Sequence, residues 1–365
     1  MKSSQYIQHN QQLVQTLPTY INEYYLDKST VPLSPATLYQ YLNEFYRFFT
    51  WMIDVGITDV KTVKEIPLSA LEHFKKQDME LYKSYLLNRG KQTASHPQAP
   101  ISHRTVNRSL NALSALFRYL SEENETADGE PYFYRNVMKK IALVPDSETY
   151  QTRANNIKDQ LMLGNADVKY IEFIQNDYPK TLTNKRTLSL YQRDRERDVA
   201  INALMLGTGI RVSELTNANV SDLNLSKAAI VVRRKGGKYD SVPIASWVLP
   251  YLATYLNVRK QRYLATKTTP ALFLTKGASQ PRRISTATVE LLVAKYSQVF
   301  NHVRITPHKL RHTLASKLYL ETNNEHLVAT QLGQSSTNAT GLYTHIIDTK
   351  QRQALDKLHR DKQRH

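Results

Sequence analysis

The sequence predicts two domains: an all-α domain at the N-terminal end and a mixed α+β domain, mainly helical, that contains a small β-hairpin sheet. The length of 365 residues is more than one hydrophobic core usually serves, so two domains are favoured. Through the first third of the chain, apolar residues recur at helical steps of three and four. The clearest β-branched runs come later and flank a Gly-Gly turn, which is typical of a hairpin.

Three amphipathic helices are predicted in the N-terminal domain. The first spans residues 35–52, with Ser34 as its N-cap and a proline at its first position. The second spans residues 71–87 and the third spans residues 102–120. Each has one apolar stripe, so the three can share a core.

The third helix shows Arg104, Arg108 and Asn111 on a face away from its apolar stripe. Guanidinium and amide groups on a free helix face can reach phosphates and base edges in a DNA major groove. We therefore predict that these three residues bind DNA. The alternative is an ordinary solvated helix face.

The charge of the chain supports a polyanionic partner. Its 49 Lys+Arg against 32 Asp+Glu give a net charge of +17, which favours DNA, RNA or an anionic membrane over an unspecialised basic protein. There is no cysteine, so disulfides, thiolate metal sites and cysteine nucleophiles are excluded. The chain has neither a signal-peptide core nor a run of about 18 apolar residues. We expect a cytoplasmic protein without a membrane segment.

Polar, turn-rich stretches separate the two domains. We place a helical domain at residues 1–150, a linker at 151–165 and the second domain at 166–365. In the second domain, a polar, basic stretch at 180–197 precedes an apolar helix predicted at 198–206.

A Gly-Thr-Gly break at residues 207–209 ends that helix, and Arg211 begins the next one. Backbone N–H groups and the positive end of the helix dipole favour an anion at such a position. An arginine adds a bidentate donor for phosphate. A surface arginine without a ligand is the alternative.

A β-hairpin is predicted from strands at 229–234 and 239–244, with Lys235 and Lys238 on either side of its turn. A hairpin lysine can enter a DNA minor groove or protonate a leaving oxygen. It can also serve solubility alone.

A helix beginning near residue 306 carries His308 and Arg311 on one face. His308 and His312 have the spacing of half a zinc site, but no carboxylate stands between them. The positive charges of Lys309 and Arg311 favour a phosphate over a metal cation, so we expect no metal.

Tyr343 follows a Gly- and Ser/Thr-rich segment and is one of 23 tyrosines. It becomes a candidate catalytic residue only in combination with the charged and histidine residues that precede it in the chain. Arginines can neutralise the nonbridging oxygens of a phosphate, a tyrosine can attack phosphorus, and histidine and lysine can move the protons. The sequence shows no carboxylate cluster for magnesium and no P-loop for ATP, so we expect no cofactor. The groups so combined are Arg211, Lys235, His308, Arg311 and Tyr343.

Four stretches carry a resemblance to a known family: GTGIRVSEL, RRKGGKYDSVPI, HKLRHTLAS and LGQSSTNATGLYTHI. In this order and spacing they resemble the tyrosine recombinase (phage integrase) family. The resemblance covers essentially the whole C-terminal domain and, more loosely, the N-terminal one. The length and the polar interdomain stretch are most similar to the stand-alone Xer type.

This resemblance implies a core-binding (SAM-like) domain followed by a catalytic domain, and a homotetramer that holds two duplexes of double-stranded DNA. Tyr343 would form a 3′-phosphotyrosyl bond without metal or ATP, and Lys235 rather than Lys238 would hold the catalytic position. The tail after Tyr343 would be a helix donated to a neighbouring protomer, and a bare amphipathic tail is the alternative. The Xer likeness further implies chromosome dimer resolution at a dif-type site, activated by the translocase FtsK.

Gln334 departs from the family pattern, which usually has His or Trp at this position as a donor to the phosphate. A glutamine amide can also donate a hydrogen bond, so we expect activity. The alternatives are an integrase of a mobile element, a catalytically weakened DNA-binding accessory protein and a topoisomerase that only relaxes DNA.

Overall fold

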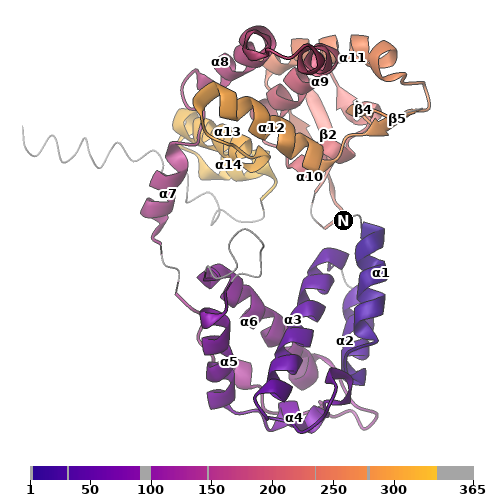
Figure 1. Ribbon diagram of the computed structural model, residues 1–365, viewed down its shortest axis with the longest axis vertical. Coiled ribbons are helices and arrows are strands. Elements are labelled where there is room, and N and C mark those ends of the chain that lie inside the picture. The colour runs from indigo at the N-terminus through magenta and orange to yellow at the C-terminus, as the bar shows by residue number, and fades with distance from the viewer. Residues whose placement is uncertain are drawn as a thin grey trace, which may run out of the picture. The chain divides into compact units, whose positions relative to one another are not determined.

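The chain forms two compact units, Met1–Ser147 and Glu148–His365, each with its own hydrophobic core (Figure 1). The structure, a computed structural model, describes residues 3–30, 33–90, 100–145, 148–234, 236–277 and 280–334. Within these ranges no helix is both long and apolar enough to cross a membrane.

The first unit is helical. Aromatic side chains of α3 and aliphatic side chains of α6 meet in its core, where Phe45, Phe48 and Leu113 are fully buried. Its helices are α1 Ser3–Val14, α2 Thr19–Thr30, α3 Pro35–Asp54, α4 Leu68–Glu72, α5 Lys76–Asn88 and α6 His103–Arg118.

Two predicted helix starts in this unit are confirmed. The Ser34 hydroxyl accepts a hydrogen bond from the Thr37 backbone N–H at 3.1 Å, and Ser102 accepts one from Thr105 at 3.2 Å. Each bond satisfies a backbone donor that the helix itself leaves unpaired.

The helix predicted at residues 71–87 is wrong as a single element, because the structure has α4 and α5 with a break between them. The Lys75 backbone N–H donates to the Asp78 carboxylate at 3.0 Å and starts α5 afresh. This local cap competes with a continuous helix, which the apolar spacing alone does not reveal.

The second unit combines helices with two small antiparallel sheets, ordered β1-β2-β3 and β4-β5. In the first sheet, Ile230 lies opposite Val242, so two apolar side chains face the core. The helices are α7 Tyr150–Lys158, α8 Ala166–Glu172, α9 Lys185–Thr208, α10 Val212–Asn217, α11 Leu249–Tyr263, α12 Thr286–Asn301, α13 Pro307–Thr322 and α14 Glu325–Leu332. The strands are β1 Leu223–Asn224, β2 Ala229–Arg233, β3 Tyr239–Pro243, β4 Leu274–Lys276 and β5 Pro281–Arg283.

Much of the segment 151–165, the expected linker, forms α7. Ala154 of this helix is fully buried in a small cluster with Ala315 of α13 and with Val328 and Leu332 of α14. The helix therefore packs on the second unit, to which it belongs.

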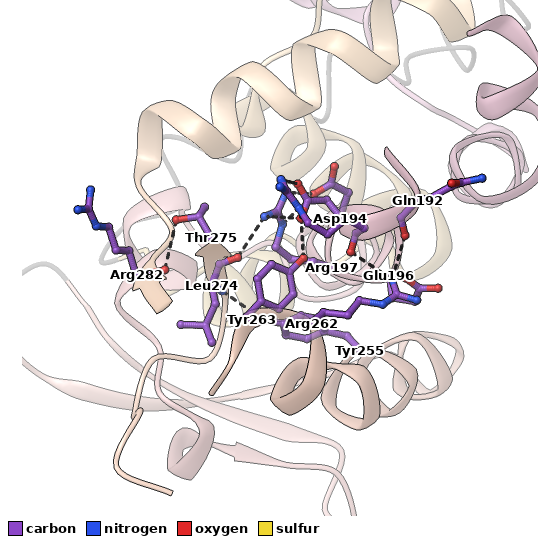
Figure 2. Close-up of polar contacts among 12 residues, drawn as sticks. Gln192, Asp194, Glu196, Arg197, Tyr255, Arg262, Tyr263, Leu274, Thr275 and Arg282 are labelled. Carbon is purple, nitrogen blue, oxygen red and sulfur yellow. Dashed lines mark hydrogen bonds and ion pairs between the residues drawn. The ribbon is translucent and has the colours of Figure 1, made fainter. Parts of the chain in front are cut away.

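The polar stretch at 180–197 is not separate from the helix predicted after it: α9 is one helix of 24 residues. Four of its charged residues, Asp194, Glu196, Arg197 and Asp198, are buried and paired rather than solvated. Figure 2 shows polar contacts of Asp194, Glu196 and Arg197. Arg197 donates to Asp198 at 2.7 Å and to the Leu274 carbonyl at 3.1 Å, while the Tyr263 hydroxyl donates to Asp194 at 2.9 Å. Because ion pairs replace apolar contacts along this face, hydrophobic spacing does not mark it as a helix.

Arg197→Met is expected to lower the free energy of unfolding by about 3 kcal/mol, since it leaves two buried carboxylates without their shared partner. Urea unfolding measures the loss. The control is Arg193→Met, which removes a more exposed arginine that pairs with Asp194, and we expect a loss below about 1 kcal/mol. Equal losses for the two variants would contradict a special role for the buried pair.

Candidate active site

The site is organised around the end of α9, where Gly209 adopts a left-handed φ of +67°. A Cβ at this position would lie 2.8 Å from Leu332 Cδ2 and 2.9 Å from Leu314 Cδ2. Only glycine provides both the backbone conformation and the space. The end of α9 therefore lies directly against α13 and the end of α14.

Arg211 is the N-cap of α10, as predicted. Its backbone N–H donates to Glu214 Oε2 at 2.7 Å, and its Nη1 donates to Glu214 Oε1 at 2.8 Å. The side chain remains 36% exposed. One edge of the guanidinium is therefore held by the protein, while part of it faces solvent and can meet an anion.

Glu214 is buried and holds a second arginine. Arg234 donates from Nη1 to Glu214 Oε2 at 3.0 Å, from Nε to Asp240 at 3.0 Å and from Nη2 to the Gln331 carbonyl at 3.2 Å. These bonds join the hairpin to α10 and to α14. Glu214 and Arg234 were missed by sequence reasoning; the position of Glu214 three residues after the N-cap was a usable capping signal.

Arg311 lies on α13 and is only 3% exposed. Its Nη1 donates to the Gly209 carbonyl at 2.6 Å and its Nη2 donates to the Leu332 carbonyl at 2.8 Å. The predicted arginine thus ties the end of α9 to the end of α14.

His308 lies in the first turn of α13 and is exposed. Desolvation of the ring, followed by the positive charges of Arg311, Lys309 and Arg211, lowers its pKa below the ordinary value. The three cations therefore lie near enough to act on this imidazole. At neutral pH His308 is a neutral group that can accept a proton.

His312 packs against His308, with 4.4 Å between ring centroids and an edge-to-face angle of 77°. Burial, then the charges of its neighbours, lowers the pKa of His312 to about 3. Throughout the part of the chain that the structure covers, no three His, Asp or Glu side chains form a group that could hold a metal ion.

Gln334 follows Gly333, which ends α14 with a φ of +59°. Its backbone N–H donates to the Ala329 carbonyl at 2.9 Å. The Gln334 side-chain Oε1 is buried and has no hydrogen-bond partner within the described ranges. A Cβ on Gly333 would lie 2.3 Å from Arg234 Nε, so the end of α14 rests directly on the hairpin arginine.

Of the six predicted catalytic residues, the structure places four: Arg211, His308, Arg311 and Gln334. Arg311 follows His308 by one turn on α13 and donates to the Gly209 carbonyl, two residues before Arg211, and Gln334 follows the α14 end that Arg311 holds. Lys235 and Tyr343 lie outside the described residues. Two guanidiniums held beside the end of α9, with an imidazole one turn before one of them, form a site suited to a phosphate.

The three predicted DNA-binding residues share an exposed face of α6. Arg104, Arg108 and Asn111 make no hydrogen bond or ion pair with any residue that the structure describes. Arg118, at the end of the same helix, is paired with Glu123 at 2.6 Å. The beginning and middle of the helix therefore carry free positive charge, whereas its end is neutralised.

Sequence comparison gives a family and near full-length relatives. The model of the phage integrase family matches residues 175–350. Tyrosine recombinase XerS from Streptococcus sanguinis strain SK36 is 51% identical over 343 residues, which are 94% of this chain and 96% of that protein. Tyrosine recombinase XerS from Lactococcus lactis subsp. lactis strain IL1403 is 48% identical over 358 residues, with 98% and 100% covered.

Solved structures share the fold at low sequence identity. XerH bound to its difH substrate in a pre-cleavage complex has a TM-score of 0.56 and 20% identity, covering 85% of this chain and 76% of that chain. A lambda integrase (75–356) dimer bound to a COC′ core site has a TM-score of 0.54 and 16% identity, covering 91% and 95%.

Lys309→Gln is expected to raise the pKa of His308 toward its ordinary value of 6.5, because it removes one of the cations that disfavour the protonated ring. Histidine NMR across a pH titration measures the shift. Lys317→Gln removes a lysine of the same helix that pairs with Asp167 instead, and it should leave His308 unchanged. A downward shift in Lys309→Gln would contradict the electrostatic account.

Proposed function

The chain belongs to the phage integrase family of tyrosine recombinases, and from that premise we propose how its residues act on DNA. It is an Xer-type site-specific recombinase, an enzyme that cuts and rejoins DNA strands. The observation that carries the proposal is that the protein fixes both Arg211 and Arg311 beside the Gly209 end of α9, with His308 one turn before Arg311 on α13.

Arg211 and Arg311 bind the nonbridging oxygens of the scissile phosphate. Both guanidiniums are oriented before DNA arrives, Arg211 by Glu214 and Arg311 by two backbone carbonyls. Preorganised donors stabilise the charge that develops on the phosphate without a cost of reorganisation. Glu214 also holds Arg234, so the hairpin that carries Lys235 starts from an anchored position.

In the cleavage step, the Tyr343 hydroxyl attacks phosphorus and passes its proton to His308. The P–O bond to the 5′-oxygen breaks, and Lys235 gives that oxygen a proton. The products are a 3′-phosphotyrosyl bond and a free 5′-hydroxyl. Attack by the 5′-hydroxyl of the partner strand reverses the same events and releases Tyr343, so the bond energy is retained.

Gln334 supplies one more donor in this scheme. Its amide nitrogen is the group that would donate to a nonbridging oxygen. In this role it replaces the His or Trp that is usual in the family.

The biological role that we propose is chromosome dimer resolution at a dif-like site, by a homotetramer on two duplexes and with FtsK as activating partner. Its support is the identity of about half of all residues with XerS relatives over nearly the whole chain. The XerH and lambda integrase neighbours share the fold alike, so the support comes from the XerS relatives. This support favours the Xer role over an integrase of a mobile element.

A nicked duplex is expected to trap a covalent complex with the wild-type enzyme and none with Tyr343→Phe, because the released strand diffuses away and rejoining is blocked. The duplex carries the binding site recovered by selection from a random DNA pool, and denaturing gels detect the complex. Tyr134→Phe, which alters an exposed tyrosine of the first unit, should trap as much as wild type.

The same assay separates the enzyme from a catalytically weakened accessory protein. Binding of the duplex by the wild type without any covalent complex would contradict the recombinase chemistry. Strand exchange between two duplexes then separates a recombinase from a topoisomerase that only relaxes DNA.

Arg104→Gln and Arg108→Gln are each expected to weaken DNA binding several-fold and to reduce the slope of log affinity against log salt by about 0.9, the value for one lost phosphate contact. Fluorescence anisotropy between about 50 and 200 mM salt measures both. Arg118→Gln serves as the control on the same helix, since Glu123 already neutralises that arginine. A slope reduced equally by all three would contradict a specific DNA-binding face.

A further inference from the structure

A groove lies between α3 and α6 in the first unit, with a volume of about 210 Å³. Its walls are partly polar and partly apolar. The residues that matter for its chemistry are Asn43, Glu44 and Arg47 from α3 and Arg108 and Ser109 from α6.

The acid in this groove is buried and its position is fixed from two sides. Glu44 is only 5% exposed. The Tyr82 hydroxyl of α5 donates to Glu44 Oε1 at 2.7 Å, and Arg47 pairs with Glu44 Oε2. Burial, followed by the charge of Glu44, raises the pKa of Tyr82 well above its usual value, so this hydroxyl remains a donor.

The two arginines of the groove have unused donors. Arg47 is about one-third exposed and gives one nitrogen to Glu44; its other N–H groups find no acceptor among the residues that the structure covers. Arg108, from the facing helix, has no hydrogen-bond or ion-pair partner within those residues. With Glu44 counted, the groove has a net charge of +1.

A buried carboxylate beside a surface that meets DNA is unfavourable on charge alone, because it repels the phosphates. It also costs free energy to bury. Both facts are explained if the acid orients an arginine, because a guanidinium fixed at one edge presents its remaining donors in a set direction.

We propose that this groove is a binding site for a backbone phosphate of DNA, in which Glu44 is a positioning residue that aims Arg47 at the phosphate and Arg108 binds it from the opposite wall. The inference rests on the proposed function in one respect, the assignment of Arg108 to DNA binding. It adds α3 to the DNA-binding surface and gives the buried acid a role.

The test compares two variants that change the net charge equally and for which the proposal predicts different results. Glu44→Gln removes the positioning acid, whereas Glu123→Gln removes an acid of the same unit that neutralises Arg118 and Lys28. Affinity for a random-sequence duplex of about 30 base pairs is measured by anisotropy across a range of salt.

Glu44→Gln is expected to weaken binding about three- to tenfold and to reduce the salt slope by up to about 0.9. Glu123→Gln should bind as tightly as wild type or more tightly. If Glu44 serves only to balance charge, its loss makes the unit more positive and binding becomes tighter. Unchanged or tighter binding by Glu44→Gln therefore overturns the proposal.

Thermal unfolding measures whether Glu44→Gln lowers the stability of the protein. If it does, two further variants still decide the test. Tyr82→Phe removes the donor to Glu44 without changing charge and should weaken binding in the same direction. Arg47→Ala should reduce the salt slope by about 0.9; wild-type affinity and slope in this variant overturn the proposal whatever the Glu44 variant does.

The binding measurements on the Glu44 and Arg47 variants do not depend on the cleavage chemistry. A wild-type enzyme that forms no covalent complex with a nicked duplex would defeat the proposed function, yet the groove would stand if the Glu44 and Arg47 variants lose affinity as expected. Normal covalent trapping with unaltered binding in those variants would defeat the groove alone.

Discussion

The buried guanidinium of Arg311 is the interaction on which the rest of the catalytic unit depends. It donates to the Gly209 carbonyl at the end of α9 and to the Leu332 carbonyl at the end of α14. An arginine so deeply buried must find acceptors, because an unpaired charge in the interior is strongly unfavourable. The positions of three helices are therefore coupled to the residue that we propose neutralises the phosphate, and Gly209 permits the approach because it has no Cβ.

Acidic residues determine which cations of this basic chain are paired within the protein. Glu214 pairs with both Arg211 and Arg234. On α6, Glu123 pairs with Arg118, whereas Arg108 has no acidic partner among the described residues. Along α9 the acids pair internally with arginines and support packing instead (Figure 2). The net charge of +17 favours a polyanionic partner, and the placement of these carboxylates determines which arginines are paired within the protein.

Elements set by local chemistry were predictable. The start of α3 followed from Ser34, because a cap needs only the next three residues, and the predicted range 102–120 begins at the residue that caps α6. The hairpin followed from its β-branched strands and Gly-Gly turn. The predictions failed where other contacts outweighed the apolar spacing, as at the Asp78 cap that divides α4 from α5 and at the ion-paired face of α9.

The sequence by itself determined the family, the fold class, and the types and order of the candidate catalytic residues, because each motif is a short contiguous stretch. Only the tertiary structure showed that Glu214 joins Arg211 to Arg234, that Arg311 bonds a carbonyl 102 positions away, and that His308 has a lowered pKa. The reason is physical: ion pairing between distant segments and the desolvation of a side chain are properties of its surroundings, and these exist only once the chain has packed.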